Sequence, residues 1–349
     1  MSENPANPFE SISQPDRERE EIQESTNLMK CLLDKRYVAE NKKILRGVHP
    51  KSHGCVSATF KINDDIAMAY QVGLFSTPGK EHKAVIRFSN AAALVAPDMV
   101  NNENASRGMA IKVYAVDGNV LQDDSGEKNQ DFLMINTPSF AFVNTEDYLK
   151  LNQILLKNND NPDEFFAPLA INPATCPHGV LAAFKVIQEI KSRPVANPVE
   201  VQYFGAAPFL FGPDRAMKFS ARPKGSLKQQ QPPQNPSADY LKEALQQRLA
   251  EPEPIVFDFM IQVRHNDGSD LGIEDATTVW DENQFPFIPV ATITIPTPQL
   301  DIYSQENENH CENLVFTPWH SLTDHQPLGS INRLRKDVYN LSATHRKGS

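Results

Sequence analysis

Two short segments near opposite ends of the chain carry residue types that could perform redox chemistry. The first, GVHPKSHG at residues 47–54, contains His49, whose imidazole can accept and return a proton near neutral pH. Pro50 and Gly54 disfavour a regular helix at this point. A lone histidine in such a segment is most often a solvated or structural loop residue. The interpretation of His49 therefore depends on what the rest of the chain supplies.

The second segment, RKDVY at residues 335–339, places Arg335 and Tyr339 four residues apart, on one face of an expected helix. The ordinary interpretation is an exposed cation–tyrosine pair. The chemical interpretation is a tyrosinate that ligates ferric iron. This would require lowering the tyrosine pKa from about 10 by about 3, which corresponds to roughly 4 kcal/mol. Iron would supply most of that free energy and a guanidinium beside the phenolate the rest.

Composition excludes several classes of function. The formal net charge of −10 and the pI of about 5.4 disfavour nucleic acid as a partner. No run approaches the ~18 uncharged apolar residues of a spanning helix, and the N-terminal residues do not resemble a secretory signal. The four cysteines contain no CxxC pair, which favours a reducing, cytoplasmic compartment. They are Cys31, Cys55, Cys176 and Cys311.

Hydrophobic periodicity predicts helices at both ends of the chain and in its middle. Residues 1–15 are rich in Pro, Ser and Asn and are expected to be loosely ordered. An amphipathic helix is expected over 16–43, with Asp16 as its cap. Ser330 is expected to cap the last helix. The remaining helices are expected over 144–156, 178–191, 238–249 and 330–341.

Short β-branched runs bounded by turn residues predict strands on both sides of the central helices. In one of them Phe257, Phe259 and Ile261 fall on a single face. A Gln/Pro-rich loop is expected at 228–237. Since the order shows no βαβ rhythm, we expect an α+β fold, an antiparallel β-barrel decorated by helices. The runs cover residues 83–89, 108–116, 132–136, 254–264 and 290–295.

The order of five segments resembles that of the haem catalase superfamily. The segments are RGVH (46–49), IRFSNA (86–91), SRGMAIKVY (106–114), FLMINTPSF (132–140) and RLRKDVYNLSATHR (333–346). The likeness covers about residues 44–346 and is closest to the short catalase-related peroxidases, which lack the C-terminal helical domain. It implies a catalase-like haem-binding barrel over 44–349, with the proximal haem ligand on its C-terminal helix. An N-terminal arm and amphipathic helix over 1–43 would precede this barrel.

The resemblance also implies roles for individual residues. Tyr339 corresponds to the proximal ligand of haem iron and Arg335 to its charge partner. His49 corresponds to the distal acid–base group, Asn136 to the second distal polar group, and Ser89 to the serine that orients the histidine. The implied cofactor is haem b with ferric iron. Its propionates would be held by Arg46, Arg87 and Arg346. Val48 corresponds to the apolar residue that precedes the distal histidine.

These residue types suit peroxide chemistry. A neutral imidazole can take a proton from one peroxide oxygen and return it to the other, and an amide can polarise the bond between them. The resemblance implies a haem-dependent peroxidase with some catalase activity. It would reduce hydrogen or organic peroxides via a ferryl intermediate and oxidise a small organic donor, in a response to oxidative stress. Neither nucleic acid nor a membrane span is expected, and a homo-oligomer is an open option.

Two alternative functions fit the same residues. The first is a catalase-like enzyme that converts fatty-acid hydroperoxides or hydrates fatty acids. Threonine tends to precede the distal histidine in the hydroperoxide-converting branch, so Val48 speaks against it. The second is a non-enzymatic haem-binding or storage protein, which would need neither His49 nor Asn136.

The chain departs from the family at two places. HPKSHG, residues 49–54, replaces the small-residue run that usually follows the distal histidine, and NLSATHR after Tyr339 lacks the usual Pro-Asp. Phe140 and Phe142 are expected either in the haem pocket or in the barrel core. His320, beside a tryptophan, is expected to be structural. Five other histidines are expected to be solvated: His53, His82, His178, His310 and His325.

Overall fold

The computed structural model describes residues 9–99, 106–122, 126–225 and 231–348. Most of the segment expected to be loosely ordered at 1–15, and the start of the loop expected at 228–237, lie outside these described residues. None of the described helices combines the length and the apolar composition needed to cross a membrane.

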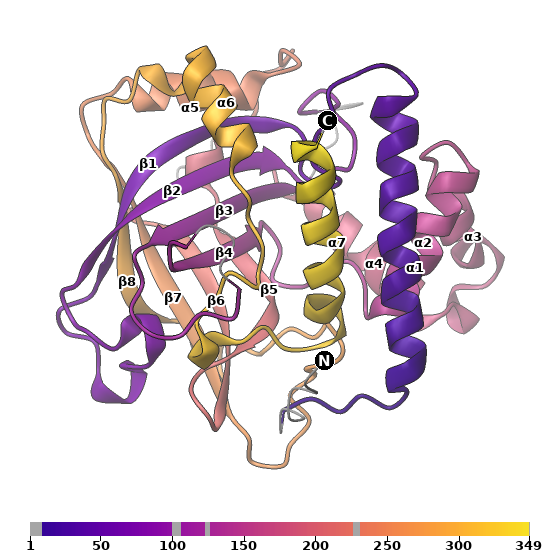
Figure 1. Cartoon of the computed structure of the whole chain (residues 1–349), viewed down its shortest axis with the longest axis horizontal. Coiled ribbons are helices and arrows are strands. Elements are labelled where there is room, and N and C mark those ends of the chain that lie inside the picture. Colours follow the sequence, from indigo (N-terminus) through magenta and orange to yellow (C-terminus); the bar gives the residue numbers. More distant parts are fainter. Residues whose placement is uncertain (1–8, 100–105, 123–125, 226–230, 349) are drawn as a thin grey trace.

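A closed antiparallel barrel dominates the described part of the chain (Figure 1). Each strand pairs with the next one in sequence, and β1 closes the barrel by pairing with β8. The predicted α+β fold, an antiparallel barrel decorated by helices, is confirmed. The strands are β1 (Ser52–Ile62), β2 (Glu81–Asn90), β3 (Arg107–Tyr114), β4 (Asn129–Ile135), β5 (Tyr203–Leu210), β6 (Arg215–Pro223), β7 (Ile255–His265) and β8 (Ile288–Ile295).

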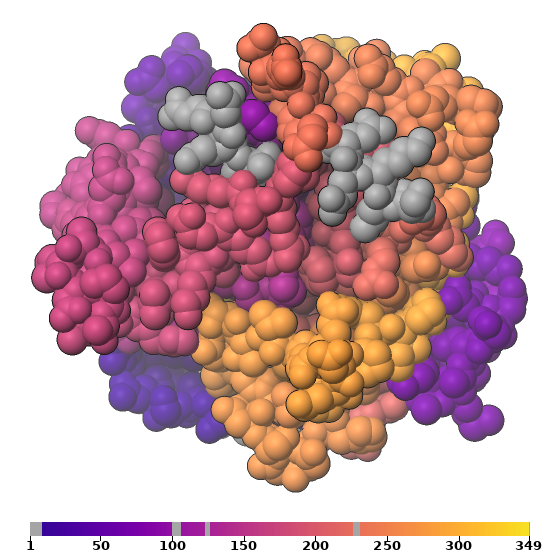
Figure 2. Space-filling view, turned by 180° about the vertical axis from the view of Figure 1, so that it is seen from behind, coloured from indigo at the N-terminus to yellow at the C-terminus, as the bar shows by residue number. Residues whose placement is uncertain are grey.

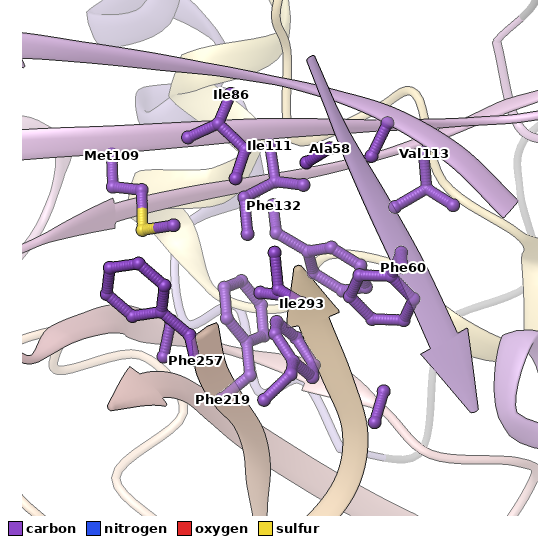
Figure 3. Packing of buried hydrophobic residues seen from close by; sticks show 14 of the residues in the cluster. Ala58, Phe60, Ile86, Met109, Ile111, Val113, Phe132, Phe219, Phe257 and Ile293 are labelled. Carbon is purple, nitrogen blue, oxygen red and sulfur yellow. The ribbon is translucent and has the colours of Figure 1, made fainter. Parts of the chain in front are cut away.

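Aromatic and β-branched side chains fill the barrel interior (Figure 3). The ring of Phe132 lies 5.0 Å from that of Phe219 and 4.5 Å from that of Phe259, between centroids. Phe257, Phe259 and Ile261 all point inward and are fully buried, as their alternation predicted. The inside of the barrel is packed core, so a binding site has to lie on the outer face of the strands.

Helices cover one side of this barrel. Figure 1 shows α1 standing beside α7, and Figure 2 shows the α2–α4 segment forming a lobe at the edge of the opposite view. The helices are α1 (Pro15–Leu33), α2 (Thr145–Lys157), α3 (Asp163–Ile171), α4 (His178–Ser192), α5 (Tyr240–Leu249), α6 (Gln305–Asn313) and α7 (Ser330–Lys347).

Several predicted boundaries of the first and last helices are wrong. The last helix runs to Lys347 instead of ending at residue 341. The first helix starts at Pro15, with Gln14 rather than Asp16 as the N-cap. It ends at Leu33 and continues only as a short π-helical turn, instead of running to residue 43. The last helix is capped by Gly329, not Ser330, because the chain enters it with a φ of 85°, which glycine adopts without strain.

The N-terminal helix α1 packs on α2 and on the C-terminal helix α7. Met29 and Leu33 form a buried cluster with Leu334 and Val338 of α7. Arg333 of α7 adds an ion pair with Glu18 of α1. The segment predicted as a separate arm therefore helps to hold α7 against the barrel. The division at residue 43 stays a prediction.

The structure joins Cys55 of β1 to Cys311 of α6 in a disulfide, with Cα atoms 5.8 Å apart. Cys31 and Cys176 are free. The sequence-based expectation of a reducing compartment rested on unpaired cysteines, and this pairing removes that support. Spacing along the chain could not reveal it, because the two cysteines are 256 residues apart.

Replacing Cys55 by Ser is expected to lower the free energy of unfolding by about 2–4 kcal/mol under oxidising conditions, because the crosslink constrains the unfolded chain. Urea unfolding with and without dithiothreitol measures the difference. The matched control is Cys31→Ser, which removes an exposed free thiol. Equal stability of Cys55→Ser and the oxidised wild type would show that the disulfide does not form.

The environment of the histidines partly corrects the sequence analysis. His320 is buried, with its Nδ1 2.9 Å from Asp131 Oδ2, so the structural role predicted for it is confirmed. His178 and His310 are exposed, as expected. The expectation of solvation is wrong for three residues, which tertiary packing buries: His53, His82 and His325.

Acid is expected to destabilise the protein through His325. Burial lowers the pKa of His325 to about 4, and its Nε2 accepts a hydrogen bond from the Leu74 N–H at 3.1 Å. The ring is therefore neutral in the folded state. Between pH 6.5 and 4 the unfolded chain binds a proton that the folded chain does not. The free energy of unfolding should thus decrease as the pH is lowered through this range, by about 1.4 kcal/mol per pH unit from this group.

Urea unfolding at pH 7, 6 and 5 tests this contribution. His325→Asn should be less stable at pH 7 but should show a shallower pH dependence. His310→Asn changes an exposed side chain and should keep the wild-type slope. A wild-type slope in His325→Asn would mean that other groups cause the acid sensitivity.

Candidate functional site

A cavity of about 340 Å³ lies between the outer face of β2–β5 and the helix α7. The lining comes from segments that are far apart in sequence, including the loop before β1, the residues around 140, and α4. Phe140 and Phe142 line this cavity, so they lie in the pocket and not in the barrel core, the two environments expected for them. The structure brings together all but one of the predicted site residues: Arg46, Val48, His49, Arg87, Ser89, Arg335, Tyr339 and Arg346 line the cavity.

Helix α7 presents Arg335 and Tyr339 to the cavity one turn apart, as their spacing predicted. The guanidinium carbon of Arg335 lies 5.2 Å from the centroid of the Tyr339 ring. Arg335 is buried, and its Nη1 donates a hydrogen bond to Asn332 Oδ1 at 3.0 Å. The pair is therefore not the exposed cation–tyrosine pair of the ordinary interpretation. The Tyr339 ring therefore lies beside a fixed positive charge.

His49 enters the cavity from the loop before β1. Its Nδ1 lies 3.0 Å from Ser89 Oγ, the contact that the family resemblance implies. With Nδ1–H donating to this hydroxyl, Nε2 keeps its lone pair as a proton acceptor. His49 also has a φ of 57°, which is uncommon for a residue other than glycine. Such backbone strain is found preferentially at functional sites.

Burial, and then the positive charges of Arg87, Arg335 and Arg46, lower the pKa of His49 to about 3. The imidazole is therefore neutral over the whole physiological range. A neutral ring can accept a proton from a bound molecule, whereas a charged one cannot. His49 thus has the protonation state that a general base requires.

Three arginines gather at one end of the cavity around Glu312 of α6. Arg46 Nη1 donates to Glu312 Oε2 at 2.6 Å, and Arg87 Nη2 lies 3.5 Å from Glu312 Oε1. Burial alone would raise the pKa of Glu312, but the charges of Arg46, Arg87 and Arg346 hold it below its usual value. Three guanidiniums and one carboxylate leave a net charge of about +2 at this end.

Asn136 is the predicted residue that does not line the cavity. It is buried, and its Oδ1 accepts hydrogen bonds from the Arg107 N–H at 2.8 Å and from Ser106 Oγ at 3.2 Å. Its neighbour Ile135 lines the cavity instead. The amide nitrogen of Asn136, Nδ2, is buried and has no hydrogen-bond partner among the described residues. The distal role implied for Asn136 stays a prediction.

Sequence reasoning missed three residues that shape the site. Ile135 could have been found from strand alternation, because it shares a face with Leu133, which also lines the cavity. Asn332 is three residues before Arg335, one helical turn, and is fully buried. Glu312 carried no local signal, because its arginine partners are up to 266 residues away in the chain.

The lining of the cavity suits a largely apolar group that carries two carboxylates and a metal ion. Two buried guanidinium nitrogens beside it, Arg87 Nε and Arg335 Nε, have no hydrogen-bond partner among the described residues. The excess of about two positive charges at the arginine end matches two carboxylates. Among the described residues, no group of three or more His, Cys, Asp and Glu side chains could hold a metal. Tyr339 is therefore the candidate metal ligand at this cavity. Haem fits this set of groups.

Comparison with known proteins agrees with this geometry. The family model for catalase matches residues 24–170, which include His49, Arg87 and Ser89. This part of the chain is therefore similar to the catalase family. The matched range does not reach Arg335 or Tyr339.

Solved structures of catalases share the fold of this chain. Catalase A from Saccharomyces cerevisiae is 18% identical, with a TM-score of 0.65, and the alignment covers 88% of this chain and 62% of that one. A fungal catalase is also 18% identical, with a TM-score of 0.64 and coverages of 90% and 61%. A bacterial catalase is 16% identical, with a TM-score of 0.64 and coverages of 99% and 63%.

The chain thus spans about three fifths of the length of these catalases. No curated protein matches it by sequence. Similarity at this level of identity establishes the fold, and the activity has to be argued from the site itself.

Proposed function

We propose that this protein is a haem-dependent peroxidase with some catalase activity, which reduces peroxides and oxidises a small organic donor. The observation that carries the proposal is that His49 and the Arg335–Tyr339 pair line one cavity, although they lie almost 300 residues apart in the sequence. A binding or storage protein would not need a neutral imidazole with a serine fixing its tautomer.

Each residue has a defined part in this proposal. Tyr339 would hold the haem iron through its phenolic oxygen, and Arg335 would be its charge partner. The cofactor carboxylates would pair with Arg87 and Arg346, while Arg46 is held by Glu312. Bound haem, with ferric iron, would supply the centre at which the oxygen–oxygen bond of a peroxide is cleaved. His49 would take the proton from the peroxide oxygen that approaches the metal and return it to the departing oxygen.

The decisive experiment is to load the purified protein with haem and record its spectrum and its reactions. A high-spin ferric Soret band, without thiolate or bis-histidine features, is the expected spectrum. Oxygen release from hydrogen peroxide should be slower than peroxide-dependent oxidation of an organic dye. Failure to bind haem, or peroxide turnover no faster than that of free haem, would contradict the proposal.

A second candidate is a catalase-like enzyme that converts fatty-acid hydroperoxides or hydrates fatty acids. Its support is the apolar wall formed by Leu133, Ile135, Val186 and Phe204, which suits a lipid chain. The test is consumption of a lipid hydroperoxide without any donor, which a peroxidase cannot sustain. For fatty-acid hydration the corresponding test is a hydroxy acid formed without peroxide.

We also propose a cytoplasmic location and a role in the oxidative stress response. A homo-oligomer is an open option, and light scattering would measure the oligomeric state. In the cytoplasm Cys55 and Cys311 would be kept as thiols, whereas an oxidising compartment would keep their disulfide. Rapid alkylation of the protein in fresh cell extract, followed by mass spectrometry, would measure which form is present. A full disulfide would contradict the cytoplasmic location without affecting the haem proposal.

A further inference from the structure

The strands behind the cavity place Ile135 next to the imidazole of His49. Ser89, Gly108 and Ile135 are directly paired across β2, β3 and β4, so their positions form one row on the outer face of the barrel. The His49 ring lies over the middle of this row, because a Cβ added to Gly108 would be 2.4 Å from its Nδ1. Neighbouring strands are about 4.8 Å apart, which puts the Ile135 side chain one strand spacing beyond the ring.

The amide of Asn136 cannot take the place of Ile135 without breaking existing contacts. Its oxygen is held by the Arg107 N–H and by Ser106 Oγ. Its nitrogen, Nδ2, is buried without a hydrogen-bond partner among the described residues, but Asn136 does not line the cavity. Ser89 Oγ is already engaged with His49 Nδ1. Among the described residues, no asparagine or glutamine side chain lines the cavity, and β4 contributes the apolar residues Leu133, Met134 and Ile135 to it.

This arrangement treats different peroxides differently. Hydrogen peroxide has no apolar part, so hydrogen bonds alone must orient it, and no amide side chain lines the described cavity beside the His49 imidazole. An alkyl hydroperoxide has a second source of binding free energy, because its alkyl group can be buried against Ile135, Leu133 and Phe204. Interactions that orient the reacting oxygens increase the rate of cleavage.

We propose that Ile135 is a specificity-determining residue that makes the site selective for apolar organic hydroperoxides over hydrogen peroxide; this rests on the proposed peroxidase function. In the reaction the O–O bond of ROOH breaks. The organic donor DH₂ supplies two electrons and two protons, and the products are ROH, water and the oxidised donor D.

The test compares kcat/KM for cumene hydroperoxide with kcat/KM for hydrogen peroxide in three haem-loaded proteins. The wild type should prefer cumene hydroperoxide by about tenfold or more. Ile135→Asn should narrow this preference by about tenfold, because one added hydrogen bond is worth about that factor. Ile135→Val keeps an apolar wall and should keep the preference. A wild type that prefers hydrogen peroxide, or equal preferences in Ile135→Asn and Ile135→Val, would overturn the proposal.

A binding measurement checks the same residue without turnover. Fluoride binds ferric haem and accepts hydrogen bonds, so an added donor should tighten it. Absorbance titration should give a fluoride dissociation constant about tenfold lower for Ile135→Asn than for wild type or Ile135→Val. Ile135→Ser introduces a smaller donor and replaces Ile135→Asn if that variant does not fold. Unchanged fluoride affinity in a folded, loaded donor variant would also overturn the proposal.

The outcomes separate this proposal from the one on which it rests. If the wild type binds no haem, both fail. If it binds haem and turns over peroxides, but the donor variants behave like Ile135→Val, then only the role of Ile135 is refuted.

Discussion

Replacement of Tyr339 by Phe is expected to abolish stable haem binding. The substitution removes only the phenolic oxygen, the group proposed to bond to the metal. Loss of residues that merely support metal ligands costs about 10- to 100-fold in affinity, so loss of the ligand itself should cost about 100-fold or more. The ratio of haem to protein after gel filtration, and the Soret absorbance, measure the effect.

Tyr148 provides the matched control, because it is a second phenol that lines the same cavity. Burial, and the nearby Tyr339, raise the pKa of Tyr148 above its usual value, so its phenolate is disfavoured. Tyr148→Phe should therefore retain the wild-type Soret spectrum. Haem loss in Tyr148→Phe together with retention in Tyr339→Phe would show that the metal ligand has been assigned to the wrong tyrosine.

Replacement of His49 by Gln is expected to leave haem in place and to lower the rate of peroxide cleavage per haem by about 10²- to 10⁴-fold, the usual contribution of a general acid–base group. A glutamine of similar length can still form a hydrogen bond with Ser89, but it cannot accept the proton. Stopped-flow mixing of the loaded protein with peroxide measures this step directly.

His53→Gln is the control from the same segment. His53 does not line the cavity, and its Nε2 lies 2.8 Å from Asn90 Oδ1. This variant should lose stability and keep its rate per bound haem. Comparable loss in both variants would indicate that the segment, and not the His49 imidazole, is what matters.

The low pKa of His49 also predicts a pH profile. Its ring is neutral above about pH 4, because burial and three arginines lower its pKa to about 3. The rate of peroxide cleavage should therefore stay level from pH 8 down to pH 5 in assays shorter than acid unfolding. A fall in rate centred near pH 6.5 would mean that the imidazole titrates like a solvated histidine.

The sequence by itself determined the class of fold and the principal chemical groups. Alternation of β-branched and aromatic residues predicted the inward face of the strand that carries Phe257, and the absence of a βαβ rhythm predicted an antiparallel barrel. The four-residue spacing of Arg335 and Tyr339 predicted their common helical face. These features are local, so they can be read from a few neighbouring residues.

Tertiary structure decided which groups meet. Cross-strand register places Ile135 beside the His49 ring, and the Arg107 N–H holds the Asn136 oxygen. Docking of α6 inserts Glu312 among the arginines, and the same helix brings Cys311 to Cys55. Each of these contacts joins residues that are distant along the chain. Their partners are therefore set by the packing of whole elements, which no local pattern of residues records.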